Sequence, residues 1–345
     1  MDTLALIAFG IILIILINVK IFIAVTTGRC TSKAKLNGKT VLITGANSGI
    51  GKETAIDMAA RGARVILGCR NLKSAEDTKQ EIISKTGNTN IVIYQIDFES
   101  LTSVRKFSKL IHENENRLDV LINNAGAMGL GNKITEDGLH IIMQVNHFGP
   151  FLLTNLLLDL LKKSAPSRIV TVSSMGHKSS SLDSDNLNKP RSDDLNYFNS
   201  KLCNILMSNE LARKLDGTNV TSNSLHPGVV HTEITKHLPW HKRLPLSFIS
   251  WFFFKNAQEG AETTIHCAVC EKVDGISGKY FQDCKEYWTL PITSNKELSE
   301  KVWNKICFLK LYVIVTMGRC TSKRKLNGKT VIVTGATSVF IDNGK

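Results

Sequence analysis

Residues 44–51 read Thr44-Gly45-Ala46-Asn47-Ser48-Gly49-Ile50-Gly51, between an apolar run at 40–43 and a helical stretch at 52–61. The glycines allow a tight turn and let the backbone approach a phosphate closely. The helix that follows offers unpaired N–H groups and a partial positive charge at its N-terminus. The segment therefore predicts a strand, turn and helix that bind a pyrophosphate, with the contact candidates Gly45, Asn47, Ser48, Gly49, Ile50 and Gly51.

The chain beyond this turn alternates between two kinds of segment. Short β-branched runs occur at 40–43, 64–67, 91–96, 118–122, 168–172 and 219–225, and the stretches 52–61 and 74–85 have the character of helices. Continuous apolar strands alternating with helices predict a parallel sheet covered on both faces. Right-handed crossovers make it a doubly wound, Rossmann-type sheet. We expect a single α/β domain over residues 36–306.

The composition narrows the class of protein. The chain has 345 residues, 43% of them hydrophobic, and a formal net charge of +13. Its basic residues are spread out and no nucleic-acid motif is visible, so a membrane surface or a phosphate-bearing cofactor explains the charge better. The eight cysteines are irregularly spaced, which argues against a disulfide framework. Cys267 and Cys270 have redox or zinc spacing but lie in an apolar helical stretch without a second pair, and we predict no metal site.

Residues 1–25 are predicted to form a membrane anchor. No charged residue occurs from 3 to 17, and apolar character resumes after Lys20. A helix of this length crosses a hydrocarbon core of about 30 Å. Only Asp2 precedes the segment, whereas five basic residues lie between 20 and 39, which places the remaining chain in the cytosol. A cleaved signal peptide is the alternative; the endoplasmic reticulum is the default membrane, and mitochondria stay open.

The C-terminal tail repeats the start of the predicted domain. Residues 310–338 match residues 20–48 at 20 of 29 positions, at a constant offset of 290 residues. In the copy, Val339 and Ile341 replace the second and third glycines of the phosphate turn. We interpret residues 310–345 as a truncated duplicate of residues 20–55, a fusion scar without cofactor-binding function.

Four further motifs follow in order along the chain. They are Asn123-Asn124-Ala125-Gly126, Ser173-Ser174, Tyr197-Phe198-Asn199-Ser200-Lys201 and Pro227-Gly228-Val229-Val230-His231-Thr232. Together with the Gly-x-x-x-Gly-x-Gly turn, this set resembles the short-chain dehydrogenase/reductase family over about residues 36–306. The resemblance implies hydride transfer between a nicotinamide cofactor and an alcohol or carbonyl compound. It also implies cofactor contacts from Asn124, Ala125, Gly126, Tyr197, Lys201, Pro227, Gly228 and Thr232.

The end of the second strand indicates which cofactor is used. NAD-dependent enzymes of this architecture usually have an acidic residue there, which binds the adenosine ribose. This chain has Cys69 followed by Arg70, and an arginine pairs well with the 2′-phosphate of NADP. Lys52 adds positive charge beside the turn, and we predict NADP(H). By resemblance, Asp97 lies near the adenine; its alternative role is to cap the helix that begins near Ser100.

Tyr197 and Lys201 are four residues apart and therefore share one face of a helix. By resemblance, Tyr197 exchanges a proton with the substrate oxygen, Ser174 hydrogen-bonds that oxygen, and Lys201 binds the nicotinamide ribose. We expect the Lys201 ammonium and the oxidised nicotinamide to lower the pKa of Tyr197 from about 10 toward working pH. Asn146 matches the family residue that holds a proton-relay water. Ser173 is the neighbour that could be confused with Ser174.

Within the family, the chain resembles the retinol dehydrogenase branch. The matching features are the N-terminal anchor, the Cys69-Arg70 pair and the segment from Ser200 to Leu206. This implies a lipophilic alcohol or aldehyde as substrate, retinol and retinal foremost, with NADPH favouring reduction. The apolar segment 244–254 falls where the family has its substrate lid. A steroid or other lipid carbonyl reductase is the alternative enzyme, a non-catalytic NADP-binding membrane protein is the alternative of another class, and a homo-oligomer stays open.

Overall fold

The structure, a computed structural model, describes residues 10–11, 14–15, 17–21, 25, 27–230, 254–317, 331–333 and 339–341, with side chains as far as Cys307. The chain divides into two compact parts, Met1–Asn304 and Lys305–Lys345. Thr232 and most of the predicted lid, 244–253, lie outside the described residues. The predicted domain limits, 36 and 306, stay predictions.

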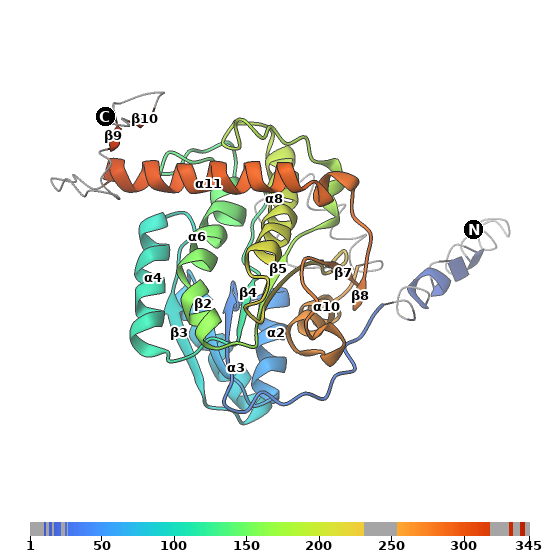
Figure 1. Cartoon of the computed structure of the whole chain (residues 1–345). Coiled ribbons are helices and arrows are strands. Elements are labelled where there is room, and N and C mark those ends of the chain that lie inside the picture. Colours follow the sequence, from blue (N-terminus) through green and yellow to red (C-terminus); the bar gives the residue numbers. More distant parts are fainter. Residues whose placement is uncertain are drawn as a thin grey trace. The chain divides into compact units, whose positions relative to one another are not determined.

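Eight strands of the described residues form one sheet (Figure 1). In spatial order they are β3 (Ile91–Gln95), β2 (Arg64–Cys69), β1 (Thr40–Thr44), β4 (Val120–Asn123), β5 (Ser167–Val172), β6 (Val220–His226), β7 (Tyr280–Gln282) and β8 (Lys285–Glu286). Every neighbouring pair is parallel except β7 and β8. The strand order reverses at β1, and ligands of such sheets bind at the carboxyl ends of strands beside this point. The predicted doubly wound parallel sheet is confirmed.

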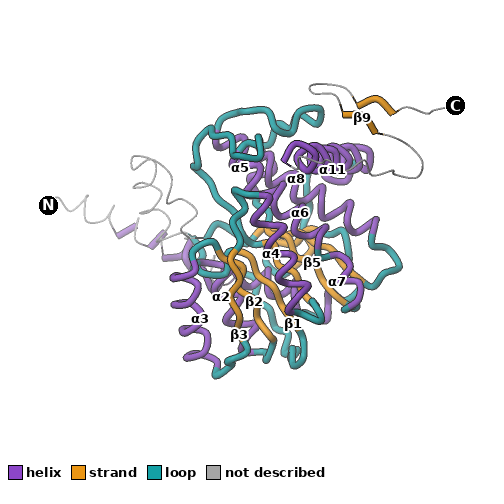
Figure 2. The backbone as a smooth tube through the Cα atoms, turned by 90° about the vertical axis from the view of Figure 1, so that its left-hand side faces the viewer, coloured by secondary structure: helices purple, strands orange, loops and turns teal. Residues whose placement is uncertain are grey.

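Helices cover both faces of this sheet (Figures 1 and 2). One face carries α2 (Gly49–Ala60), α3 (Leu72–Thr86) and α10 (Ala257–Val269), with α2 packed against both of the others. The opposite face carries α4 (Leu101–Asn114), α6 (Gly149–Leu156) and α8 (Asp193–Lys214). The shorter helices are α5 (Ile141–Met143), η1 (Gln144–Phe148), α7 (Leu158–Lys163), η2 (Met175–Ser179), η4 (Glu271–Val273) and η5 (Pro291–Ser294).

The helix starts predicted at 52 and 74 are two or three residues late. Ser48 is the N-cap of α2, so the helix already includes the last glycines of the turn. Asn71 caps α3, and its side chain accepts a hydrogen bond from the N–H of Ser74. Capping residues set a helix boundary through local hydrogen bonds, which apolar periodicity does not reveal.

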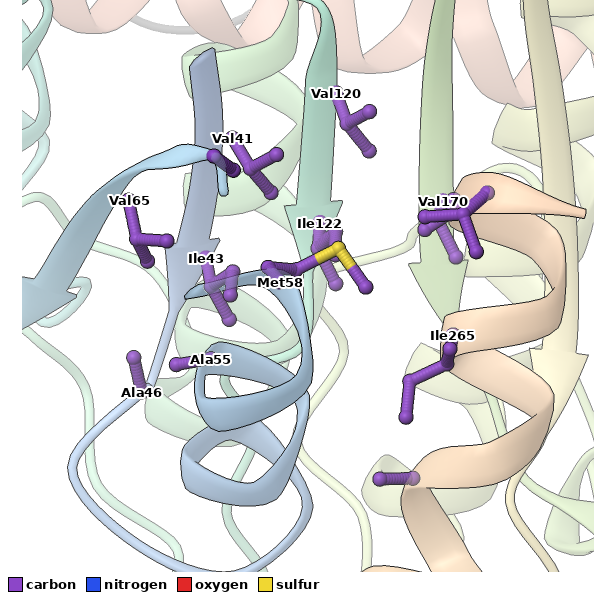
Figure 3. Close-up of a cluster of buried hydrophobic side chains, with 14 of the residues drawn as sticks. Val41, Ile43, Ala46, Ala55, Met58, Val65, Val120, Ile122, Val170 and Ile265 are labelled. Atoms are coloured by element: carbon purple, nitrogen blue, oxygen red, sulfur yellow. The ribbon is translucent and has the colours of Figure 1, made fainter. Parts of the chain in front are cut away.

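The apolar strands form the core between the sheet and its α2 and α10 face (Figure 3). The strand residues there are Val41, Ile43, Val65, Val120, Ile122 and Val170, and the helix residues that meet them include Ala55, Met58 and Ile265. On the other face of the same strands, Leu42, Ile66 and Leu121 are fully buried. Each such side chain contributes about 1.5–3 kcal/mol when it leaves water. This two-sided core holds the carboxyl end of β1, where the glycine turn begins.

The predicted membrane anchor falls mostly outside the described residues. Among the residues that are described, no helix combines the length and the apolar character needed to cross a bilayer. Asn18, which interrupts the predicted apolar segment, donates its side-chain amide to Ile14 O at 2.8 Å. The anchor therefore stays a prediction without structural support.

The segment that follows the predicted anchor is attached to the domain. The N–H of Cys30 donates to Glu262 Oε2 on α10 at 2.7 Å. Arg61 Nη1, at the end of α2, donates to Ser32 O at 3.0 Å. Polar contacts to two helices thus hold the chain before β1 in a defined position.

The C-terminal part contains the end of α11 (Lys296–Met317) and two strands, β9 (Val331–Val333) and β10 (Val339–Ile341). In the repeat, β9 corresponds to residues 41–43 of β1. It pairs with β10 in antiparallel fashion, whereas β1 has parallel neighbours. Because valine and isoleucine replace two glycines, the copy is extended where the first repeat turns into a helix. Its lack of cofactor function stays a prediction.

Candidate active site

The glycine turn after β1 lies at the carboxyl end of the sheet. Gly45 and Gly49 have φ angles of +65° and +52°, a left-handed conformation that side chains disfavour. Gly51 is needed for space, because a Cβ there would lie 2.3 Å from Gly45 O and 2.5 Å from Asn124 Nδ2. The turn thus exposes backbone in the way that close approach of a pyrophosphate requires.

Hydrogen bonds between Thr44, the last residue of β1, and Asn124, which follows the neighbouring strand β4, hold this turn in place. Asn124 Nδ2 donates to Thr44 O at 2.8 Å and to Gly45 O at 3.3 Å. Thr44 Oγ1 accepts the N–H groups of Asn124 and Ala125 at 3.1 Å and 3.0 Å. The segment after β4 is therefore fixed against the turn after β1, and the structure brings these predicted cofactor residues together.

The N-terminus of α2 retains hydrogen-bonding capacity for an anion. Ser48 is its N-cap residue, yet the serine side chain makes no capping hydrogen bond, and the first turn has no acidic residue. The N–H groups of Gly49, Ile50 and Gly51 belong to the first turn, where a helix supplies no partner. Asn47 is directed toward α3, and its Nδ2 donates to Ser74 Oγ at 3.1 Å. The unpaired N–H groups at the start of α2 fit the pyrophosphate of a dinucleotide.

The adenosine end of the predicted site is more acidic than expected. Arg70 forms an ion pair with Glu99 and lies 3.9 Å from Asp97 Oδ1. The Arg70 side chain is 56% exposed, so a phosphate could still reach the guanidinium. Asp97 does not cap α4, because that position belongs to Ser100, whose side chain accepts the N–H of Ser103.

Lys52 does not face the turn as a free charge. Its ammonium binds Glu81 of α3 at 3.0 Å. Glu81 also binds Lys85 at 2.7 Å, within the same helix. The contribution predicted for Lys52 is therefore largely neutralised by α3, a partner that is distant in the sequence.

Helix α8 carries Tyr197 and Lys201 one turn apart. Lys201 Nζ donates to Val172 O at 3.2 Å and lies 5.5 Å from the centre of the Tyr197 ring. The Ser174 side chain lies near enough to the Tyr197 hydroxyl to lower the pKa of the tyrosine. Ser173 points elsewhere, because its hydroxyl donates to Lys201 O at 2.7 Å. The geometry therefore favours Ser174 over its neighbour.

Lys201 lies beside Gly126, in the segment that follows β4. A Cβ on Gly126 would lie 3.2 Å from Lys201 Nζ and 3.5 Å from Asn146 Oδ1. Asn146 is buried in the π-helical turn η1, where its Oδ1 accepts Ala127 N–H at 2.7 Å. Its Nδ2 donates to Ala127 O at 2.9 Å and to Ser200 Oγ at 3.2 Å. Asn146 thus links the segment after β4 to α8.

Burial dominates the electrostatics of the two titratable candidates. It raises the pKa of Tyr197 above the usual value of 10, and the hydrogen bond with Ser174 offsets only part of this effect. Burial also lowers the pKa of Lys201 from 10.5 to about 8. In the protein without cofactor, desolvation therefore sets the direction of the Tyr197 pKa shift, and the lowering expected with the oxidised nicotinamide bound stays a prediction.

The last predicted motif follows β6. Gly228 has φ +92°, and Pro227 precedes it at the strand end, whereas Thr232 lies outside the described residues. Sequence reasoning missed Lys255, whose side chain packs over Gly228 and whose ammonium binds Asp283 Oδ1 at 2.5 Å. The only signal in the sequence is a charged residue directly after an aromatic run, which indicates no particular partner.

His147, next to Asn146, makes the fold sensitive to acid. It is fully buried, and Nδ1 contacts Asn204 Oδ1 at 2.9 Å. Burial lowers its pKa from 6.5 to about 4. Between these values the unfolded chain binds a proton that the folded chain does not, so stability falls on acidification by about 1.4 kcal/mol per pH unit. We expect His147→Gln to weaken this dependence, measured by urea unfolding at pH 7 and pH 5.

His112→Gln is the matched control for that experiment. Hydrogen bonds to Ser108 O and Asp159 raise the pKa of His112, so its protonated form stabilises the fold at low pH. Its loss should make the fall in stability steeper, which is the opposite of the change expected for His147→Gln. An unchanged pH dependence in His147→Gln would contradict this account.

This combination of fold and site occurs in a known class of enzyme. The chain belongs to the short chain dehydrogenase family, which it matches over residues 39–242. It is similar to retinol dehydrogenase 14 of Mus musculus, with 47% identity over 283 residues that cover 78% of this chain and 85% of the relative. Retinol dehydrogenase 11 of Homo sapiens is 43% identical over 292 residues, covering 82% and 89% respectively.

A solved structure has the same fold. The crystal structure of an uncharacterized protein from Mycobacterium Paratuberculosis matches with a TM-score of 0.67 and 29% identity, covering 83% of this chain and 98% of that one. The predicted family is confirmed. The protein is an oxidoreductase that acts on a small-molecule substrate with a nicotinamide dinucleotide, NAD or NADP.

Proposed function

We propose that this protein reduces a lipophilic aldehyde, retinal foremost, to the alcohol with NADPH as the reductant. The observation that carries the proposal is that Ser174 lies beside the buried residues Tyr197 and Lys201, next to Gly126 and the glycine turn. The similar proteins of mouse and human are named retinol dehydrogenases, which supports a retinoid substrate.

The proposed chemistry centres on the substrate oxygen. Bound NADPH supplies a hydride for the carbonyl carbon. As negative charge develops on the carbonyl oxygen, Tyr197 donates its phenolic proton and Ser174 donates a hydrogen bond. Lys201, which is charged at neutral pH, stabilises the phenolate that Tyr197 leaves behind. Asn146 acts as a positioning residue, since both ends of its amide are used to join the segment after β4 to α8.

The direction of the reaction is supported by the state of the phenol. Because burial raises the pKa of Tyr197, the hydroxyl keeps its proton at neutral pH. A protonated phenol is the form needed to complete a carbonyl reduction. Oxidation of an alcohol would first require that proton to leave a buried site, so we propose reduction as the favoured direction.

The preference for NADPH rests on Arg70, the exposed cation after β2. We expect Arg70→Ala to raise the Kd of NADPH about tenfold or more and to change the Kd of NADH less than twofold. A hydrogen bond between charged groups contributes about 1.5–3 kcal/mol, and only NADPH has the 2′-phosphate. Fluorescence titration measures both constants. Equal losses for both cofactors would contradict the assignment.

Arg117→Ala is the control for this titration. Arg117 also forms an arginine–carboxylate pair, with Asp119 at 2.7 Å, but it precedes the amino end of β4. Ligands bind at the opposite, carboxyl end of a parallel sheet. Its removal should leave the Kd of both cofactors unchanged.

The substrate class is tested with a panel of retinal, a straight-chain aldehyde, an isoprenoid aldehyde and a steroid ketone. We expect the highest kcat/KM for retinal. A steroid ketone as the best substrate would identify a steroid carbonyl reductase. NADPH binding without oxidation in the presence of any panel member would identify a non-catalytic binding protein.

We also propose that residues 1–25 anchor the chain to the endoplasmic reticulum, with the NADP-binding domain of residues 36–306 in the cytosol. The uncharged run from 3 to 17 and the basic residues after it support this arrangement. A chain without residues 1–25 should be extracted from membranes by alkali, while the full chain stays; release of the full chain would contradict the anchor.

Residues 310–345 are proposed to be a non-functional duplicate, so removing 318–345 should not alter NADPH binding.

A further inference from the structure

Lys255 organises the turn that follows β6. Its Nζ donates to Pro227 O at 3.5 Å, and its main-chain N–H donates to Val229 O at 2.9 Å. Between these two carbonyl groups, a Cβ on Gly228 would lie 2.8 Å from both Cδ and Cε of Lys255. One lysine therefore contacts three consecutive residues of a turn that carries part of the predicted cofactor motif.

This turn adjoins the glycine turn of the cofactor site. Val230, at its end, forms a parallel bridge with Lys255. A Cβ on Gly260 of α10 would lie 2.7 Å from a methyl group of Val230 and 3.2 Å from Ile50 Cγ1. Val230 and Ile50 thus both pack against Gly260, which has no side chain. Because Ile50 belongs to the glycine turn, a shift of Lys255 would move the backbone beside the pyrophosphate site through Val230 and Gly260.

Asp283 holds the charged end of Lys255. Lys255 is only 8% exposed, and its ammonium lies 2.5 Å from Asp283 Oδ1. Burial alone would raise the pKa of Asp283, but the hydrogen bond and charge of Lys255 outweigh it, so the net pKa lies below its usual value. The Asp283 carboxyl is therefore ionised at neutral pH beside the Lys255 ammonium.

Asp283 is itself fixed by the structure around it. Asp283 and Cys284 have φ angles of +51° and +57°, which suit a two-residue hairpin turn between β7 and β8. On the other side, Gly28 packs so closely that a Cβ there would lie 1.9 Å from Asp283 O. The carboxylate is thus presented from a rigid hairpin, supported by the chain that precedes β1.

We propose that Lys255 and Asp283 form a clamp that positions the Pro227–Gly228 turn for dinucleotide binding. This inference rests on the proposed function, because it assigns the turn to the cofactor. The pair touches none of the reacting groups Ser174, Tyr197 and Lys201 in the described structure. Its loss should therefore weaken cofactor binding and leave the chemical step of the bound complex intact.

The test compares Lys255→Met, Asp283→Asn and the double variant in the full chain. We expect the Kd of NADPH to rise about tenfold in Lys255→Met, since an unpaired, partly buried carboxylate and a released turn both result. At saturating NADPH, kcat and the KM of the aldehyde should stay within twofold of wild type. The double variant should bind no worse than Lys255→Met, because residues that act as one unit are not additive.

Lys279→Met is the matched control. Lys279 pairs with Glu286 of the same hairpin at 2.7 Å, but both side chains are about half exposed. Its NADPH Kd should equal that of wild type. Circular dichroism establishes folding, and Asp283→Asn, which keeps the lysine stem in place, serves if Lys255→Met does not fold.

Three outcomes would overturn the clamp. They are wild-type NADPH affinity in folded Lys255→Met or Asp283→Asn, additive losses in the double variant, and an unchanged Kd with a lowered kcat. A wild-type chain that binds NADPH but reduces no aldehyde would overturn the proposed function instead. The NADPH Kd values of the variants would then still show whether the clamp positions the turn.

Discussion

Replacement of Tyr197 by phenylalanine is expected to lower the kcat for aldehyde reduction by about 10³-fold, which lies in the range for loss of a general acid. The substitution removes the Tyr197 hydroxyl, which lies near Ser174 and Lys201, and leaves the buried ring in place. Ser174 can still donate a hydrogen bond to the substrate oxygen, but the group proposed to transfer the proton is lost. Steady-state kinetics with retinal and NADPH measure the effect.

The same variant should bind NADPH with nearly wild-type affinity, since the pyrophosphate site on α2 is untouched. Tyr94→Phe is the matched control, because Tyr94 lies on the edge strand β3 and its hydroxyl hydrogen-bonds Glu115, at 3.4 Å. That change should leave kcat within twofold. A Tyr197→Phe enzyme with more than a tenth of wild-type kcat would show that another group supplies the proton.

Gly51→Ala is expected to raise the Kd of NADPH by more than about 100-fold. The new Cβ would lie 2.3 Å from Gly45 O and 2.5 Å from Asn124 Nδ2, distances that real Cβ atoms do not show. Because Gly45 O is a backbone atom, the turn itself must move. The unpaired N–H groups at the start of α2, which would bind the pyrophosphate, move with it. Fluorescence titration with NADPH measures the loss.

Gly87→Ala controls for glycine replacement as such. Gly87 ends α3 with φ +71°, and a Cβ there would meet nothing within 4 Å. This change should cost about 1 kcal/mol of stability through backbone strain and leave the NADPH Kd unaltered. NADPH affinity in Gly51→Ala equal to that of wild type would remove the glycine turn from the cofactor site.

Much of the architecture could be predicted because it depends on local pattern. The apolar runs at 40–43 and 64–67 become β1 and β2, since strands buried on both faces need continuous apolar residues. The glycine turn could be recognised for the same reason, because its conformation depends on residue types within eight positions. Family resemblance indicates Ser174, Tyr197 and Lys201, and the fold brings Ser174, which follows β5, to the helix α8 that carries the other two.

What could not be predicted depends on partners from remote segments. Lys52 and Arg70 have the charge expected for a phosphate site, yet Glu81 and Glu99 engage them. Nothing near either basic residue in the sequence indicates those acids. The raised pKa of Tyr197 in the protein without cofactor could not be predicted for a related reason, since desolvation depends on the whole surrounding packing.

Direct transfer of hydride is the central claim, and it can be followed with NADPH that carries deuterium at the transferable position of the nicotinamide. The full chain is incubated with retinal, and the alcohol product is analysed by mass spectrometry. The account predicts one deuterium on the carbinol carbon of the alcohol. The Tyr197→Phe variant should leave the aldehyde largely unreduced, so that little labelled alcohol forms. An alcohol product without deuterium from either face of the labelled cofactor, or no alcohol from any lipophilic aldehyde, would contradict it.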